Sequence, residues 1–158
     1  MPDDTEFANL MTGLRGPLIQ AHDDAYSEAR KLYNGMIDKR PRAIARCVDA
    51  ADIMTCVNFA RDRQLLVAIR GGGHNGPGLG SCDDGLVIDL SAMKGVRVDP
   101  VGRTVRAGPG CTQGDVDHAC HAFGLAVPAG IVSTTGLAGT LGGGTGYLTR
   151  IAATQSTT

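Results

Sequence analysis

Aromatic side chains are scarce in this sequence, and neither sign of charge predominates. Only 4% of the 158 residues are aromatic, tryptophan is absent, and 15 basic residues are balanced by 16 acidic ones, for a net charge of −1. A protein that binds nucleic acid usually has a basic surface for the phosphates and aromatic rings on which bases stack. We therefore expect no nucleic-acid partner.

Long apolar runs are also missing. No stretch approaches the roughly 18 consecutive apolar residues that a membrane span requires. Residues 1–9 have neither the basic start nor the apolar segment of a secretory signal. The five cysteines are odd in number and lack CxxC spacing, which disfavours a disulfide framework and a structural zinc site. We expect a cytoplasmic protein with reduced thiols, no membrane partner and no bound metal.

Glycine, by contrast, is abundant. The 23 glycines are about twice the usual share, and they cluster in residues 71–80, 108–114 and 130–146. Because glycine has no side chain, clusters beside apolar segments mark backbone that turns sharply or approaches a ligand closely.

The chain up to residue 95 has the pattern of alternating helices and strands. Residues 1–24 form a polar N-terminal arm in this interpretation. Asp49 can cap a helix that runs to about Arg63. The apolar face of that helix would consist of Ile53, Val57 and Ala60. The remaining elements expected here are a short helix at 24–33, an extended segment at 43–47, a buried strand at 65–70 and a strand at 86–90.

A different pattern begins at Val96. Residues 96–99 and 104–107 alternate between apolar and polar on either side of a turn, which predicts a β-hairpin. Thr112 can cap a helix over residues 113–123, which Gly124 ends. The side chains expected to point inward from this helix are Val116, Ala119, Cys120 and Phe123.

The fold class that these patterns predict is α+β. One αβ subdomain would span residues 25–95, and a second would begin over residues 96–150. We expect the ligand to lie between the two subdomains.

The first glycine cluster matches in form the dinucleotide-binding fingerprint GxGxxG. Residues 71–76 read GGGHNG after an apolar run, and Asp89 lies about where a ribose ligand is expected. That fingerprint must open a helix, but Pro77, Gly78 and Gly80 follow it. We therefore disfavour a Rossmann fold and expect consecutive backbone N–H groups that hold phosphate without a helix.

Four segments resemble the FAD-linked oxidases of the vanillyl-alcohol oxidase and p-cresol methylhydroxylase superfamily, in particular the berberine-bridge-enzyme-like branch. They are residues 67–75 (VAIRGGGHN), 86–91 (LVIDLS), 104–110 (TVRAGPG) and 134–150 (TTGLAGTLGGGTGYLTR). The resemblance covers residues 25–150 in the family's order. It implies a PCMH-type FAD-binding domain made of two αβ subdomains, of which the second is incomplete in this chain.

The resemblance also implies roles for the first glycine loop. Residues 70–76 would wrap the FAD pyrophosphate through backbone N–H groups, and His74 would be bonded covalently to the 8α-methyl group of the flavin. A lone histidine is more often an ordinary surface or core residue, but its place on a glycine loop after a strand favours function. Val132 stands where some relatives carry a second flavin-linking cysteine, so attachment should be single.

Residues 133–146 resemble the family's second flavin-contacting segment. Its glycines would let backbone lie against the cofactor, and its hydroxyl groups would add hydrogen bonds. A flexible linker is the alternative, which the regularly placed Leu137, Ala138 and Leu141 disfavour. The expected cofactor-binding residues are Arg70, Gly71, Gly72, Gly73, His74, Asn75, Gly76, Ser133, Thr134, Gly136, Gly139, Thr140, Gly142, Gly143 and Gly146.

Two further features carry less functional information. His118 and His121 lie three residues apart on the expected helix, as two metal ligands could, but without a clear third ligand a solvated helix face is favoured. Residues 151–158 form an atypical tail without family likeness.

The predicted function is that of the FAD-binding part of a flavin-dependent oxidoreductase. For an intact relative, the resemblance implies hydride transfer from a substrate C–H group to flavin, which oxygen or another acceptor then reoxidises. The part that would bind a small-molecule substrate is absent from this sequence, so no catalytic residue is assigned. The alternative is a truncated, non-catalytic remnant that binds FAD weakly or not at all.

Overall fold

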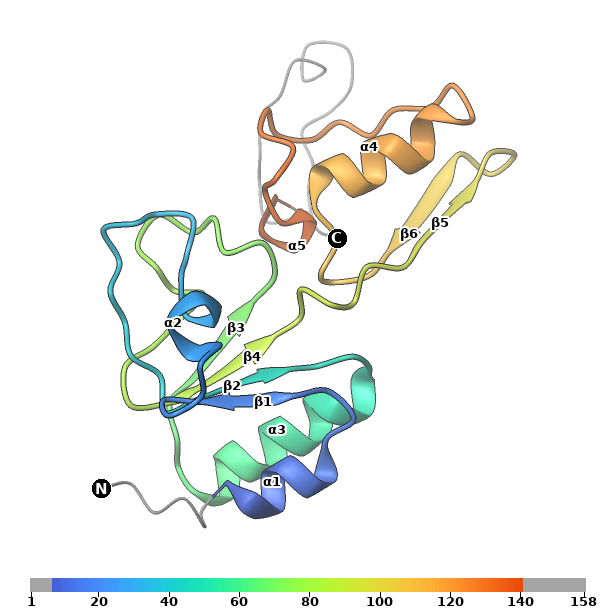
Figure 1. Cartoon of the computed structure of the whole chain (residues 1–158). Helices are drawn as coiled ribbons and strands as arrows, with labels where there is room; N and C mark the ends of the chain where they lie inside the picture. The colour runs from blue at the N-terminus through green and yellow to red at the C-terminus, as the bar shows by residue number, and fades with distance from the viewer. Residues whose placement is uncertain (1–6, 141–158) are drawn as a thin grey trace. The chain divides into compact units, whose positions relative to one another are not determined.

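The computed structural model describes residues 7–140 and divides the chain into two compact units (Figure 1). The first unit contains residues up to 70 together with 75–92, and the second contains residues 71–74 together with those from 93 onward. The first glycine loop is therefore shared, because its first four residues belong to the second unit. The expected tail at 151–158 lies outside the described residues.

A four-stranded mixed sheet forms the centre of the first unit. Its strands are β1 (Leu18–Gln20), β2 (Ala43–Arg46), β3 (Val67–Arg70) and β4 (Leu86–Asp89), in the order β1-β2-β4-β3. β2 and β3 pair with β4 in parallel, whereas β1 pairs with β2 antiparallel. The central strand β4 is buried along its whole length.

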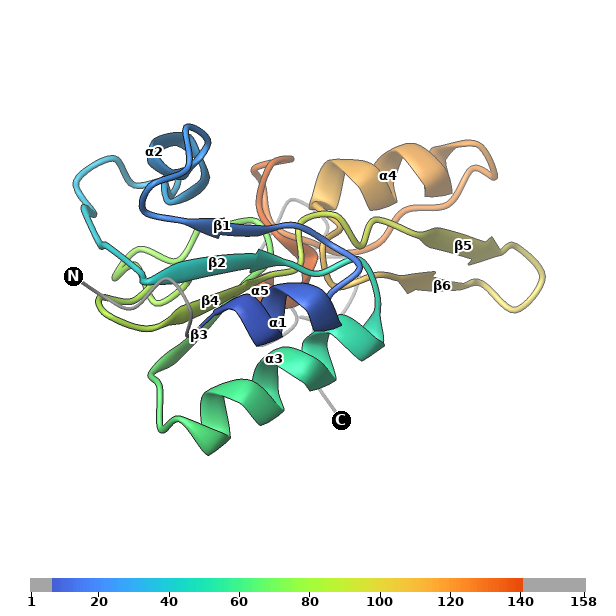
Figure 2. The same cartoon turned by 60° about the horizontal axis from the view of Figure 1, so that its bottom comes forward.

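Helices cover both faces of this sheet. α1 (Ala8–Gly13) and α3 (Ala50–Asp62) lie side by side on one face, and the short α2 (Tyr26–Ala29) lies on the other (Figure 2). The α2 face holds a buried apolar cluster, in which the Tyr26 hydroxyl donates to the Pro41 carbonyl at 2.7 Å. The members of that cluster are Ile19, Tyr26, Ala29, Ile44, Ala68, Cys82 and Val87.

The N-terminal segment differs from the polar arm that the sequence suggested. It supplies both α1 and the edge strand β1. Leu10 in α1 is 1% exposed, and Leu18 and Ile19 in β1 are buried as well. These few apolar residues are enough to attach the segment to the sheet although most of their neighbours in sequence are polar. The expected helix at 24–33 is also shorter, since only α2 forms there.

Helix α3 begins as predicted, because the Asp49 side chain caps it by accepting from the Asp52 backbone N–H at 3.0 Å. The predicted buried face was wrong in part: Val57 is exposed, and Asp52 is buried instead. Asp52 is buried because its carboxylate accepts hydrogen bonds from the backbone N–H groups of Arg15, Gly16 and Val48 at 2.8–3.1 Å. The full set of buried α3 residues is Asp52, Cys56, Phe59 and Ala60.

Strand β3 was expected to be buried, but its side chains alternate between exposed and buried. It is an edge strand, and Ile69 is 61% exposed while Ala68 and Arg70 are buried. An edge strand has a neighbour on one side only, so a helix that covers the middle of the sheet need not reach its outer face.

The second unit contains the predicted hairpin and helix. β5 (Val96–Asp99) and β6 (Thr104–Ala107) pair antiparallel, α4 (Gln113–His121) packs on them, and the one-turn α5 (Leu137–Thr140) follows. Its core is formed by Cys111, Val116 and Cys120, with hairpin residues such as Val98 and Val105 packed against them.

The end of α4 differs from prediction at one residue. Phe123 was expected inside but is 52% exposed. The helix ends at His121, and Gly124, with φ of 64°, donates its N–H to the His121 carbonyl at 3.0 Å in the expected terminating role. Leu125, beyond this turn, packs on the core, as Phe123 was predicted to do.

Candidate cofactor site

The first glycine loop lies directly against the later glycine-containing segment. A Cβ atom added to Gly72 would be 2.4 Å from the backbone nitrogen of Gly136, and one added to Gly136 would be 2.5 Å from the nitrogen of Gly72. Real Cβ atoms do not approach other atoms so closely. Glycine at both positions therefore allows two segments more than 60 residues apart to touch backbone to backbone.

The loop exposes consecutive backbone donors, as predicted. Within residues 7–140, the N–H groups of Gly71, Gly72 and Gly73 donate no hydrogen bond. Gly73 has φ of 69°, the left-handed conformation that glycine adopts without strain. Neighbouring N–H groups in such a turn can converge on an anion such as a phosphate.

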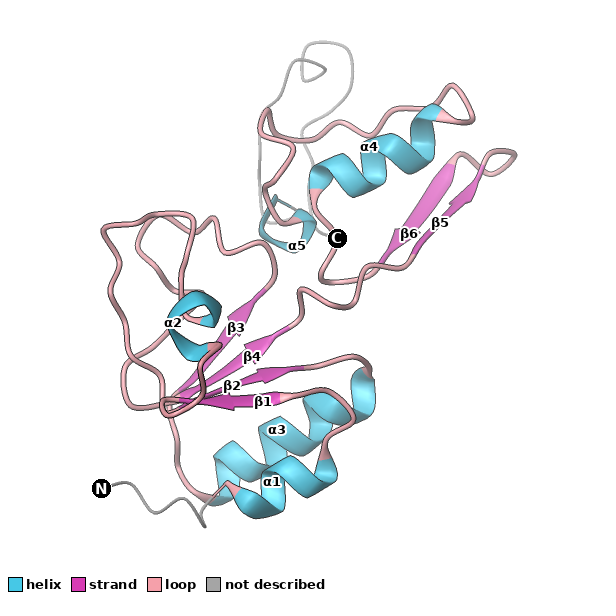
Figure 3. Ribbon diagram, viewed as in Figure 1, coloured by secondary structure: helices cyan, strands magenta, loops and turns pink. Residues whose placement is uncertain are grey.

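No helix follows the loop, which confirms that it does not open a Rossmann helix. Residues 71–85 form loop and turns between β3 and β4 (Figure 3). Asn75 instead closes a turn, because its backbone carbonyl accepts from Gly78 at 3.0 Å and its side-chain oxygen accepts from the Leu79 N–H at 2.9 Å. A helix dipole therefore contributes nothing at this loop.

His74 lies between two hydroxyl groups of the second segment. Thr134 Oγ1 is 3.0 Å from Nε2 of the imidazole, and Thr135 Oγ1 is 3.4 Å from Nδ1. The sequence singled out Thr134 but not Thr135. The structure thus brings the predicted nucleophile and one of the predicted hydroxyl residues together.

The second segment is held in place by the first turn of α4. The backbone N–H groups of Gln113 and Gly114 donate to the carbonyls of Thr135 and Ser133 at 2.9 and 2.8 Å. Thr112 caps the same turn in a reciprocal capping box with Asp115. The donors at this helix terminus are therefore engaged by the chain itself, which leaves the first glycine loop as the place for an anionic group.

Gln113 is a site residue that the sequence did not reveal. Its side chain is 2% exposed, and its Nε2 donates to Thr140 Oγ1 at 3.1 Å. The Thr140 hydroxyl in turn donates back to the Gly136 carbonyl at 3.1 Å. The Thr140 hydroxyl thus binds the chain itself, at Gln113 and Gly136. No sequence pattern predicts that a glutamine directly after a helix cap is buried.

Arg70 and Asp89 form a buried ion pair at the carboxyl ends of β3 and β4. Arg70 donates to Asp89 Oδ2 and to the Ala29 carbonyl, both at 2.8 Å, and the two charged side chains are only 7% and 3% exposed. The Arg70 guanidinium is therefore committed to the first unit. Only its backbone is placed to contribute to the loop, and Asp89 is not available as a ribose ligand.

Two of the predicted glycines have open space around them. A Cβ atom added to Gly76 or Gly139 would meet no described atom within 4 Å. The packing of the described residues therefore does not explain why these positions are glycine. A ligand that lies against the backbone would explain it. Together with the unpaired donors of residues 71–73, the open space at Gly139 makes the described residues of the second unit compatible with a diphosphate-containing cofactor. Gly142, Gly143 and Gly146 lie outside the described residues.

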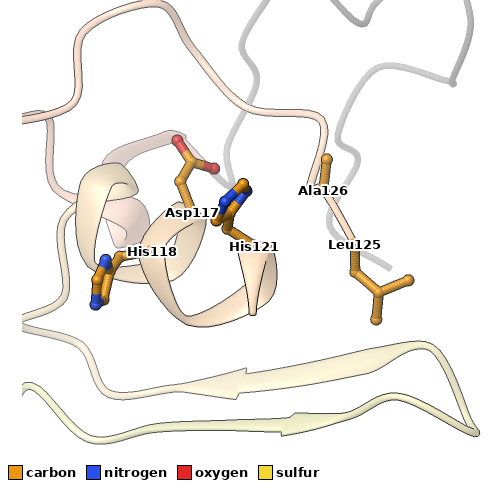
Figure 4. A pocket seen from close by; sticks show the side chains of 5 residues that line it. All are labelled: Asp117, His118, His121, Leu125 and Ala126. Carbon is orange, nitrogen blue, oxygen red and sulfur yellow. The ribbon is translucent and has the colours of Figure 1, made fainter. Parts of the chain in front are cut away.

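The two histidines of α4 lie on an exposed face of that helix. His118 and His121 are exposed and line a surface hollow of about 380 Å³ with Asp117, Leu125 and Ala126 (Figure 4). Among residues 7–140, no three potential ligands come close enough together to hold a metal ion.

No helix in the described part of the chain has the length and apolar character that crossing a lipid bilayer demands.

Comparison with known proteins identifies the relatives of this chain. It is 35% identical over 137 residues to (R)-6-hydroxynicotine oxidase of Paenarthrobacter nicotinovorans, covering 86% of this chain and 30% of the relative. The crystal structure of 6-hydroxy-D-nicotine oxidase from Arthrobacter nicotinovorans matches 90% of the chain with a TM-score of 0.87 and 34% identity. That of a BBE-like protein from Physcomitrella patens matches 92% with a TM-score of 0.86 and 27% identity.

These matches cover only part of the relatives. The chain spans about a third of the length of the two crystal structures, 32% in each case. The expected α+β fold is confirmed by both neighbours, and the expected cofactor, FAD, by the family model described as FAD binding domain, which matches residues 41–157. The chain therefore belongs to the FAD-binding domain family of the FAD-linked oxidoreductases.

Proposed function

We propose that this chain provides the FAD-binding part of a flavin-dependent oxidoreductase whose remaining residues bind the substrate. The observation that carries the proposal is the backbone contact between Gly72 and Gly136, which joins the two segments that the family resemblance assigns to FAD. When bound, FAD would accept a hydride from a substrate C–H group and pass the electrons to oxygen or another acceptor.

The residues of this chain would bind and orient the cofactor. The N–H groups of Gly71, Gly72 and Gly73 have no acceptor among the described residues and would hold the diphosphate. The open space at Gly139 leaves room for the cofactor to lie against backbone. Ser133, whose carbonyl is held by α4, would offer its exposed hydroxyl.

His74 would attach the flavin covalently. The imidazole would supply the nitrogen of an N–C bond to the 8α carbon and would give up its N–H proton, and one C–H bond of the 8α-methyl group would break. Dioxygen would take up the two protons and two electrons released and become hydrogen peroxide. The hydroxyls of Thr134 and Thr135 lie 3.0 and 3.4 Å from the imidazole nitrogens of His74. They support the assignment because they would orient a nucleophile that projects from a loop.

The described residues do not indicate which substrate the protein binds. One relative is named as acting on 6-hydroxynicotine, and alcohols, sugars, alkaloids and amines are the candidate classes for this chain. We propose that the substrate pocket and the catalytic base come from a part of the protein outside these 158 residues, because the chain spans only about a third of the relatives' length.

Cofactor binding tests this proposal directly. The purified chain is incubated with FAD, separated from free FAD by gel filtration and then denatured. We expect visible flavin absorbance to stay with the chain in both steps, whereas His74→Asn should bind FAD and release it on denaturation. A colourless wild-type chain after gel filtration would contradict the proposal and favour the non-catalytic remnant. Complete release of flavin from the denatured wild-type chain would refute the covalent bond alone.

A further inference from the structure

Two buried cysteines of the first unit lie in contact with each other. Cys47 follows strand β2 and Cys56 belongs to helix α3, and their Sγ atoms are 3.9 Å apart. Both residues have 0% of their surface exposed. The other cysteine of this unit, Cys82, lies near carbonyl groups instead, those of Leu66 and Leu86 at 4.0 and 3.9 Å from its Sγ atom.

We propose that Cys47 and Cys56 are an oxidative modification site, at which hydrogen peroxide forms a reversible disulfide. The peroxide first oxidises the Cys47 thiol to a sulfenic acid and releases one water molecule. The Cys56 sulfur then attacks the Cys47 sulfur, and the departing hydroxide takes the Cys56 proton and becomes a second water molecule. Overall, two thiols give up two protons and two electrons to one peroxide. A dithiol reductant returns both residues to thiols by exchange.

The backbone on either side of the pair is fixed. The Cys47 N–H donates to the Asp89 carbonyl at 2.9 Å, beside the last residue of β2. Only Val48 and the cap residue Asp49 separate Cys47 from the first residue of α3. The sulfur atoms of a disulfide are about 2.05 Å apart, so the two side chains must rotate toward each other while β2 and α3 stay in place. The second step is therefore intramolecular and needs no unfolding.

The two thiols differ in acidity, which assigns the order of reaction. A hydrogen bond from the Cys56 thiol lowers the pKa of the Cys47 thiol, although burial and the carboxylates of Asp52, Asp89 and Asp49 act in the opposite direction. The same hydrogen bond raises the pKa of the Cys56 thiol, and burial adds to that effect. Because the thiolate is the nucleophile toward an oxidant, Cys47 reacts first and Cys56 closes the disulfide.

The alternative is that the two cysteines only fill the core as small apolar side chains. In that case accessibility alone sets the rate of oxidation, and Cys82, which is 5% exposed, reacts before the fully buried pair. A partner thiol in contact reverses this order, because each sulfenic acid that forms is converted at once to a disulfide. The oxidase reaction proposed above would supply the peroxide, and this link alone rests on the proposed function.

Peptide mapping of the full chain tests the site without FAD. The folded, reduced chain is treated with hydrogen peroxide, its remaining thiols are alkylated in denaturant, and trypsin then releases residues 47–61, which contain both cysteines. We expect this peptide to escape alkylation and to be lighter by two hydrogen atoms, at a rate at least about tenfold above the oxidation of Cys82. Dithiothreitol before alkylation should restore both thiols. Oxidation of Cys82 as fast as that of the pair, or a peptide that stays alkylated at both cysteines, would overturn the proposal.

Single substitutions separate disulfide formation from the oxidation of an isolated buried thiol. Cys56→Ala leaves Cys47 without its partner, so peroxide should carry Cys47 on to sulfinic acid, which dithiothreitol does not reverse. Cys82→Ala is the matched control and should give the wild-type yield of disulfide. Loss of the disulfide in Cys82→Ala would contradict the pairing. Circular dichroism checks that each variant is folded, and if Cys56→Ala is not, the wild-type map decides alone.

Discussion

Single residues in this chain are buried or exposed for reasons that burial of apolar surface does not explain. Asp52 is buried because three backbone N–H groups need an acceptor, and Arg70 is buried because Asp89 and the Ala29 carbonyl accept its protons. Buried charge is tolerated in proteins only with such partners. Substitution of Asp52 or Arg70 should therefore lower the free energy of unfolding, although both side chains are charged.

The close backbone approach of Gly72 to Gly136 gives the first prediction. Gly72→Ala would place a methyl group 2.4 Å from the Gly136 nitrogen, so the two segments must separate. We expect a loss of roughly 1–3 kcal/mol in unfolding free energy and at least tenfold weaker FAD binding, measured by chemical denaturation and fluorescence titration. Gly76→Ala is the matched control, because its added Cβ meets no described atom within 4 Å and should leave stability unchanged. Equal stability of the two variants would contradict this account of Gly72.

Asp52 gives a prediction about pH. Burial alone would raise the pKa of its carboxyl, but hydrogen bonds from the backbone N–H groups of Arg15, Val48 and Gly16 prevail and lower the pKa below the ordinary 3.8. A lowered folded-state pKa stabilises the protein above the unfolded value, and that stability is lost as pH falls through the folded value.

The test is Asp52→Asn, which removes the charge at nearly constant size. We expect it to lower the unfolding free energy by roughly 1–3 kcal/mol at neutral pH, and the difference from wild type to shrink below about pH 4. Urea denaturation at several pH values measures both. A difference that stays constant down to about pH 2.5 would show that the charge of Asp52 contributes nothing.

At the scale of elements, α4 links local sequence to the cofactor site. Its cap is local, since Thr112 and Asp115 are three residues apart. Its first-turn donors nevertheless bind carbonyls about 20 residues further along, at Ser133 and Thr135. The helix start therefore fixes the segment that contacts His74.

Removal of the cap should act on both stability and binding. We expect Thr112→Ala to cost about 1 kcal/mol of unfolding free energy and, because the first turn of α4 loosens, to weaken FAD binding several-fold. Thr112→Ser keeps the hydroxyl and should behave like wild type in both denaturation and titration. Loss of stability with unchanged FAD affinity would show that the first turn does not position the second segment.

At the scale of the whole molecule, the cysteines of each compact unit are buried. Cys47, Cys56 and Cys82 are buried in the first unit, and Cys111 and Cys120 in the second. Burial raises the pKa of the Cys82 and Cys120 thiols, which reduces the reactive thiolate further.

Thiol reactivity therefore reports on whether both units are folded. We expect all five thiols of the native chain to react with a disulfide reagent at least about tenfold more slowly than a free thiol, and all five to react promptly in denaturant. Rapid reaction restricted to Cys111 and Cys120, located by mass spectrometry, would mean that the second unit is open in solution. Rapid reaction of all five would contradict the structure of both units.

Much of the fold could be predicted because its signals are local. The caps Asp49 and Thr112, the hairpin of residues 96–107 and the terminating Gly124 all depend on hydrogen bonds between near neighbours in sequence. The errors at Val57, Asp52 and Phe123 arose where the burial of a side chain depends on a partner far along the chain. Periodicity cannot reveal such a partner, because it measures hydrophobicity and not which segments meet.

The sequence by itself indicated the cofactor class, because its glycine-rich segments resemble those of the FAD-linked oxidases. Only the tertiary structure decided which residues come together there: His74 with Thr134 and Thr135, and Gln113 with Thr140. His74 and Thr134 are 60 positions apart, and their contact exists because glycine at 72 and 136 permits two backbones to touch. A local pattern specifies the conformation of a segment, whereas contact between distant segments depends on how the whole chain packs.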